Sequence, residues 1–204
     1  MHQRRYFLFA LLLWLVAAVI GFAVEAGWLR GFDAAVLLAL AIPTRAAGWP
    51  VPVLLLATTI GAAIVRLPVA AACAAAIGWA GDRRGAAMIA ASTIGILIGN
   101  AGLKLIVGRA RPELLPHLAV ETSLSFPSGH ASNAAAVYLA VGWVLVRDGA
   151  RAAIVWPWMI ALVATIGVSR VVLGVHWPTD VIAGWCVGAG WMLVCAGLCG
   201  ERRP

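Results

Sequence analysis

Long apolar runs alternate with short polar segments along almost the whole chain. Five of these runs each have about the length of one membrane-spanning helix: residues 6–24, 86–107, 129–146, 153–172 and 179–198. A helix of about 20 residues, rising about 1.5 Å per residue, crosses the hydrocarbon core of a bilayer. A longer run, 53–79, contains Arg66 and Pro68, and we interpret it as a lead-in followed by a further span near 60–79. The pattern therefore predicts six spans.

The segment between the first two spans does not fit this pattern. Residues 25–52 contain Arg30, Asp33, Arg45 and prolines among aliphatic residues, so they are too broken to span and too apolar for a solvated loop. Short interfacial helices are expected there. The predicted fold class is all-α: a six-span transmembrane helical bundle with short interfacial helices between the first and second spans, formed by a single domain over residues 1–204.

Composition also indicates a membrane protein. Hydrophobic residues make up 63% of the chain and charged residues only 11%, which is not a soluble globular composition. The formal net charge of +7 does not indicate nucleic acid binding, because the arginines are dispersed in short polar gaps and form no basic face interleaved with aromatics. The four cysteines lie in apolar runs without paired C-x-x-C spacing, and we interpret them as small buried hydrophobic residues: Cys73, Cys186, Cys195 and Cys199.

Three polar motifs interrupt the apolar pattern: K-x6-R-P at 104–112, P-S-G-H at 127–130 and S-R-x5-H-x3-D at 169–180. A charged side chain at the centre of a membrane helix costs roughly 3 kcal/mol, so charges at this depth usually pair or line a site. With six spans, parity alone places all three motifs at the same face of the membrane. We therefore expect them to form one site.

The distribution of arginines predicts which face this is. The charged start of the chain resembles that of a signal peptide, but no clean cleavage site follows, and a retained first helix is expected. Both termini and the turns after the second and fourth spans share one side, which holds Arg4, Arg5, Arg83, Arg84, Arg147, Arg151, Arg202 and Arg203. Apart from the motif cations, the other side holds Arg30, Arg45 and Arg109, with Arg66 unassigned. The positive-inside rule predicts a multi-pass protein of the cell (inner) membrane with cytoplasmic termini and an extracytoplasmic site.

The motifs contain residues suited to binding a polyanion. Lys104 is a point charge and the only lysine in the chain, whereas Arg111 and Arg170 each present a planar fork of donors that matches phosphate oxygens. Ser128 and Gly129 are typical of a helix start, with Ser128 as N-cap and the free backbone N–H groups of the first turn adding an anion site. We expect substrate phosphate to contact all of these residues.

His176 is the candidate nucleophile. A neutral imidazole can form a phosphohistidine if its other nitrogen is held by an acceptor. Pro178 suits the first position of a helix, which places Asp180 in the opening turn, where it can reach back, fix the tautomer of His176 and stabilise the imidazolium. His130 is expected to protonate the leaving group and afterwards to activate water.

Taken in order, the three motifs closely resemble the type 2 phosphatidic acid phosphatase superfamily, which includes membrane lipid phosphatases, glucose-6-phosphatase-like enzymes and soluble vanadium haloperoxidases. The resemblance covers residues 90–195. It implies the same roles for His176 as nucleophile and His130 as acid/base, in a reaction that needs no metal and no cofactor. Consistently, the sequence shows no acidic cluster for magnesium or zinc, and we interpret Glu113 and Glu121 as loop solubilisers.

These patterns predict an integral-membrane phosphatase that hydrolyses a lipid phosphate or diphosphate through a phosphohistidine. The resemblance suggests undecaprenyl diphosphate, phosphatidic acid and phosphatidylglycerol phosphate as substrates, with the polyprenyl diphosphate ranked first. The expected partners are a membrane lipid and the bilayer, and not nucleic acid. Two alternatives stay open: phosphotransfer from the same phosphohistidine to a lipid or sugar hydroxyl, and an anion transporter, which would not require a histidine held by an aspartate.

Four residues outside the motif positions are interpreted separately. Arg66 is expected to snorkel to the outer interface rather than to line the cavity. Arg109 is expected to attract a headgroup or to contact the loop. We interpret His117 as an incidental loop histidine and Asn133 as polar packing between spans.

Overall fold

The computed structural model describes residues 2–199, which form helices and no strand. The helices are α1 (His2–Glu25), α2 (Arg30–Ala47), α3 (Pro50–Gly61), α4 (Ala63–Trp79), α5 (Arg83–Val107), α6 (Gly129–Arg147), α7 (Ala152–Val172) and α8 (Pro178–Cys199). Within this part of the chain, five helices are long and apolar enough to cross a membrane, or up to six if the bent pair α2–α3 counts as one span. The predicted all-helical membrane bundle is confirmed.

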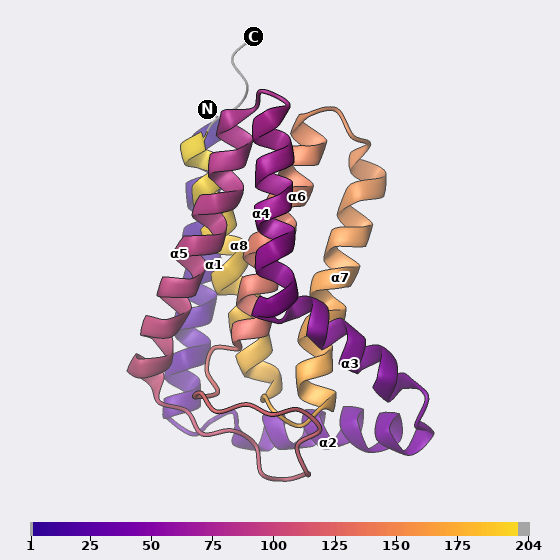
Figure 1. The fold of residues 1–204 in the computed structure, drawn as a ribbon. Coiled ribbons are helices and arrows are strands. Elements are labelled where there is room, and N and C mark those ends of the chain that lie inside the picture. The colour runs from indigo at the N-terminus through magenta and orange to yellow at the C-terminus, as the bar shows by residue number, and fades with distance from the viewer. Residues whose placement is uncertain (1, 200–204) are drawn as a thin grey trace.

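The region between the first span and α4 forms two helices of different direction. Figure 1 shows α2 lying across one end of the bundle, while α3 turns back from it at 117°. α3 then meets α4 at Ala62, whose backbone is extended. The predicted lead-in and second span correspond to α3 and α4, and α4 runs beside the other long helices although it has only 17 residues.

The centre of the bundle is α8, which packs most extensively against α1 and α6. Glycines permit this close approach: a Cβ atom on Gly184 would lie 2.8 Å from the carbonyl oxygen of Ser128, and one on Gly188 would overlap the carbonyl oxygen of Ser132. Small residues at a helix crossing let backbones of membrane helices come close together. This packing fixes the start of α6 against the start of α8, which is where two of the polar motifs lie.

The ends of the bundle differ in chemistry. The α4–α5 and α6–α7 turns lie at the end where α1 begins, and there Arg147 pairs with Asp82 and Asp148. The loop 108–128 crosses the opposite end beside α2. Arg202 and Arg203, counted above among the arginines of the first end, lie outside the described residues.

Arg45 of α2 fixes the loops at the motif end. Its Nε donates to the carbonyl of Val172 at 2.8 Å, and its Nη1 donates to the carbonyl of Pro116 at 2.9 Å. The loop itself bonds to the segment after α7, because the N–H of Leu118 donates to the carbonyl of Leu173 at 2.9 Å. The interfacial helix α2 therefore holds together segments that are distant in sequence.

Candidate active site

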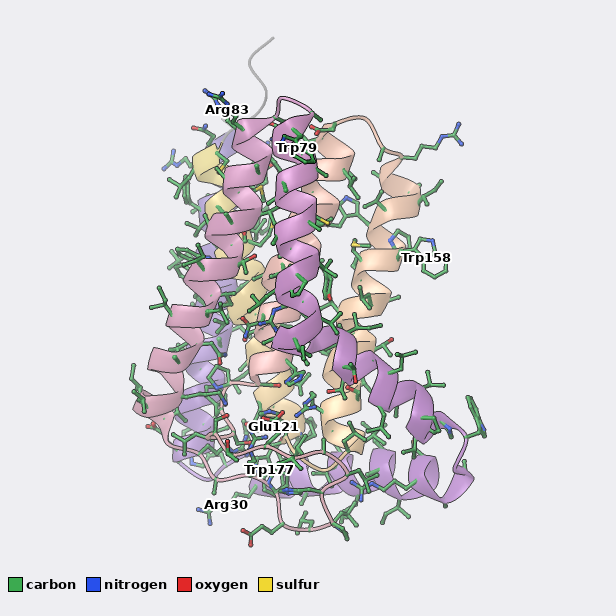
Figure 2. The ribbon with its side chains drawn as sticks, viewed as in Figure 1. Arg30, Trp79, Arg83, Glu121, Trp158 and Trp177 are labelled. Atoms are coloured by element: carbon green, nitrogen blue, oxygen red, sulfur yellow. The ribbon has the colours of Figure 1, made fainter. Side chains whose placement is uncertain are left out.

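The three polar motifs meet at the end of the bundle that α2 crosses. Figure 2 shows Glu121 and Trp177 at this end, with Trp79 and Arg83 at the other. The second and third motifs touch directly, since the N–H of Ser128 donates to the carbonyl of Asp180 at 3.0 Å. The motifs therefore lie together, as the sequence predicts.

His176 and Asp180 form a buried pair at the centre of this region. α8 begins at Pro178, as expected, and Oδ2 of Asp180 lies 3.4 Å from Nδ1 of His176. Ser125, which sequence analysis did not identify, donates from Oγ to the same carboxylate oxygen at 2.5 Å and lies 3.3 Å from Nδ1 of His176. The N–H of Trp177 also donates to Oδ2 at 3.0 Å. These contacts hold the carboxylate against Nδ1 and leave Nε2 as the nitrogen that faces Arg111.

Burial sets the protonation state of His176, which is 1% exposed. Loss of hydration lowers the pKa of His176 to about 4, although the hydrogen bond that His176 Nδ1–H donates to Asp180 opposes this shift. The imidazole is therefore neutral at physiological pH. A neutral imidazole is the form that can act as a nucleophile.

One arginine of the motifs, Arg111, lies against Nε2 of His176. Nη1 of Arg111 is 3.2 Å from Nε2 and donates to the carbonyl of Val175 at 2.5 Å. Arg170 is 1% exposed and donates to the hydroxyl of Thr58 on α3. Lys104 donates to the carbonyl of Leu124 in the loop. We call Lys104, Arg111 and Arg170 the cation cluster.

Glu121 supplies the counter-charge of the cation cluster, so its interpretation as a loop solubiliser is wrong. Its carboxylate pairs with Arg170, lies 3.5 Å from Nη2 of Arg111 and lies 3.6 Å from Nδ1 of His130. Its side chain is 19% exposed. No motif marks this residue, because the loop that brings it here has no periodic pattern. Glu113 is exposed, in keeping with a solubilising role.

The start of α6 borders the same space. Ser128 occupies the N-cap position and its carbonyl accepts the N–H of Ser132 at 3.0 Å, but its buried hydroxyl makes no hydrogen bond within residues 2–199. The predicted side-chain cap is therefore wrong, while the helix start is placed as expected. A Cβ atom on Gly129 would lie 3.9 Å from Cε of Lys104, so glycine brings the backbone close to the cation cluster. The first N–H groups of α6 have no intrahelical acceptor.

A second network, which sequence analysis did not identify, binds the other carboxylate oxygen of Asp180, Oδ1. Arg109 donates from Nη1 to Oδ1 of Asp180 and from Nη2 to Oδ2 of Asp33 on α2, both at 2.5 Å. Asp33 also accepts the N–H of Thr179 at 3.0 Å and its hydroxyl at 2.7 Å. Both carboxylates are fully buried, and Arg109 also lies over the Trp177 ring. An acidic residue in the apolar sequence of α2 is the one signal that could have indicated this network.

The three other residues interpreted from the sequence, Arg66, His117 and Asn133, form side-chain hydrogen bonds within residues 2–199 only to backbone carbonyls near them in the chain. Arg66 is 3% exposed, so the expectation that it snorkels to the interface is wrong. His117 lies 2.6 Å from the carbonyl of Pro112, within its own loop. Asn133 bonds to the carbonyl of Gly129 at 2.7 Å, within α6 rather than between spans.

The residues that the structure describes contain no group of three or more His, Cys, Asp or Glu side chains placed to hold a metal ion. The fold and the site define a class: an integral-membrane helical protein with a buried histidine–aspartate pair beside a cation cluster. Residues 85–203 match the sequence profile of the PAP2 superfamily, and the chain belongs to this family.

Comparisons with individual proteins agree. The chain is 40% identical to phosphatidylglycerophosphatase B of Bacillus subtilis over 93 residues, which cover 44% of this chain and 45% of that protein. It is 32% identical to the undecaprenyl-diphosphatase of Sulfolobus acidocaldarius over 116 residues, covering 52% and 50%. The chain thus matches about half the length of these curated relatives. A crystal structure of a transmembrane PAP2-type phosphatidylglycerolphosphate phosphatase from Bacillus subtilis superposes with a TM-score of 0.86 at 27% identity, covering 93% of this chain and 94% of that one.

Proposed function

We propose that this protein is a membrane lipid phosphatase that removes the terminal phosphate of a lipid phosphate or diphosphate through a phosphohistidine intermediate. One observation supports this most directly: His176 is held at Nδ1 by Asp180 while its Nε2 faces Arg111, which shares the Glu121 carboxylate with Arg170. Phosphoryl transfer requires a positioned nucleophile and cations around the equatorial oxygens, and this geometry offers both.

The proposed reaction has two steps. Nε2 of His176 attacks the phosphorus, and the bond from phosphorus to the leaving oxygen breaks while His130 gives that oxygen a proton. Water then loses a proton to His130 and attacks the phosphohistidine, which releases inorganic phosphate. Asp180 stabilises the positive charge that His176 gains in the first step. The substrate phosphate takes the place of the Glu121 carboxylate among the cations, and its negative charge favours the protonated form of His130.

The substrate class follows from the location of the site. Glu121, which pairs with Arg111 and Arg170, lies at one end of the bundle (Figure 2), so a lipid tail can stay in the bilayer while its phosphate reaches His176. Relatives bear the names phosphatidylglycerophosphatase B and undecaprenyl-diphosphatase, which supports lipid phosphates and diphosphates as the class. We further propose that this end faces the extracytoplasmic side, because the arginines Arg4, Arg5, Arg83, Arg84, Arg147 and Arg151 belong to the opposite end.

The proposed function is tested by phosphate release in detergent with EDTA present. The substrates are undecaprenyl diphosphate, phosphatidic acid and phosphatidylglycerol phosphate, and wild type is compared with His176→Ala. His117→Ala is the matched control, since that histidine lies in the loop and bonds to a backbone carbonyl. We expect activity that survives EDTA, is lost in His176→Ala and persists in His117→Ala. Activity that remains in His176→Ala would show that another group is the nucleophile.

A further inference from the structure

Arg66 is a buried cation that the proposed reaction does not use. It lies in the first turn of α4 and is 3% exposed. Its Nη1 donates to the carbonyl of Gly61 at 2.7 Å, and its buried Nε has no hydrogen-bond partner in residues 2–199. The ion pairs found in this part of the chain do not include Arg66. A buried charge without a partner is costly, so an anionic ligand is the natural complement.

Arg66 is connected to the active site through the last turn of α3. The carbonyl of Gly61 binds Arg66, while a Cβ atom on Gly61 would lie only 3.3 Å from Cδ2 of His130. In the same turn, the hydroxyl of Thr58 accepts a hydrogen bond from Arg170. Gly61, at the α3–α4 break, therefore lies against both the guanidinium of Arg66 and the ring of His130.

The two edges of the His130 ring face different groups. Nδ1 faces Glu121 and hence the position proposed for the terminal phosphate, whereas the Cδ2 edge faces Gly61 and the start of α4. If His130 protonates the leaving oxygen from Nε2, the ring nitrogen bonded to Cδ2, the part of the substrate beyond that oxygen lies toward Gly61 and Arg66. In a phosphomonoester the group bonded to that oxygen is an uncharged carbon. In a lipid diphosphate it is a second phosphate.

We propose that Arg66 binds the lipid-side phosphate of a lipid diphosphate and thereby makes this site selective for diphosphates over monophosphates. This inference rests on the proposed function. When the bond between the bridging oxygen and the terminal phosphorus breaks, the terminal phosphoryl group goes to Nε2 of His176. The bridging oxygen keeps the electron pair and takes the proton of His130, leaving a lipid monophosphate. Arg66 stabilises the charge that develops on this leaving phosphate.

The test compares two substrates with the same tail, farnesyl diphosphate and farnesyl monophosphate, in detergent. The quantity measured is the ratio of their kcat/KM values in wild type, Arg66→Gln and Arg66→Lys. Loss of a charge-assisted hydrogen bond predicts that Arg66→Gln lowers the ratio roughly 10- to 100-fold. Arg66→Lys keeps the charge but loses the planar fork, so its ratio should fall between those of wild type and Arg66→Gln.

Arg45→Gln is the matched control, because Arg45 also binds backbone carbonyls, those of Val172 and Pro116, and within residues 2–199 makes no hydrogen bond to either histidine of the site. It should change both substrates alike. The inference is overturned if Arg66→Gln leaves the ratio unchanged, whether both activities fall or neither does. Arg66 would then only stabilise the α3–α4 break. If Arg66→Gln does not fold, an unchanged ratio in Arg66→Lys overturns it. If wild type hydrolyses neither substrate, nor the three lipids named above, the proposed function itself fails.

Discussion

Replacing Glu121 by glutamine should make the protein bind phosphate more tightly. The carboxylate now pairs with Arg170 and lies 3.5 Å from Arg111, so any phosphate that enters must first displace it. Glutamine keeps the size and hydrogen-bonding capacity of the side chain but removes the charge. The cations of the site then lose their internal competitor while their own positions are kept.

The size of the effect can be bounded from the structure. A hydrogen bond between charged groups contributes about 1.5–3 kcal/mol, and partial solvent access reduces this value. Because the side chain of Glu121 is 19% exposed, we take roughly 1–2 kcal/mol, which corresponds to about a 5- to 30-fold lower inhibition constant for inorganic phosphate. Without ligand, Glu121→Gln should be less stable than wild type, since Arg170 is 1% exposed and loses its counter-charge.

The assay is inhibition of lipid phosphate hydrolysis by inorganic phosphate at constant pH and ionic strength. Glu113→Gln provides the control, because it removes the same charge from an exposed position of the same loop. Added phosphate should also raise the unfolding temperature more in Glu121→Gln than in wild type. Equal inhibition constants in wild type and Glu121→Gln would refute the reasoning, since the carboxylate would then not occupy the phosphate position.

Three further predictions concern the buried charges around Asp180, the packing of α6 on α8, and the protonation of His176. Arg109→Gln should destabilise the protein by about 3–5 kcal/mol, because Asp33 and Asp180 stay buried without the guanidinium between them. Denaturant unfolding in micelles measures this, and a loss below 1 kcal/mol would contradict it. Gly188→Val should unfold the protein or separate α6 from α8, which thermal unfolding would show. Because the pKa of His176 is lowered to about 4, kcat/KM corrected for substrate ionisation should stay high down to pH 5 and fall as pH drops through about 4. If kcat/KM instead fell with a pKa near 6.5, the titrating histidine would be hydrated and the prediction for buried His176 would be wrong.

The fold follows largely from local sequence. Apolar runs of spanning length form α1, α5, α6, α7 and α8, because lipid offers no partner to the backbone and a helix satisfies its own hydrogen bonds. The start of α8 at Pro178 was likewise predictable, since proline suits the first position of a helix. The contact between His176 and Asp180 follows from that start, because they are four residues apart.

The network around the site did not follow from the sequence. Arg109 and Asp33 are 76 residues apart, and Arg170 and Glu121 are 49 apart, so no local spacing relates them. The predicted surface roles of Glu121 and Arg66 were wrong for the same reason: whether a charged side chain reaches solvent depends on which helices and loops cover it. The catalytic roles of His130 and His176 stay predictions.

Sequence alone therefore determined the helices, their membrane character and the polar motifs, because hydropathy and short-range spacing act within one segment. Tertiary structure alone decided which charges neutralise one another. In a low-dielectric interior each buried charge takes the nearest partner that packing supplies. Packing thus joins Asp33 to Asp180 through Arg109 and puts Glu121 among the cations. It also buries Arg66 against Gly61, which borders His130, without a counter-charge in residues 2–199.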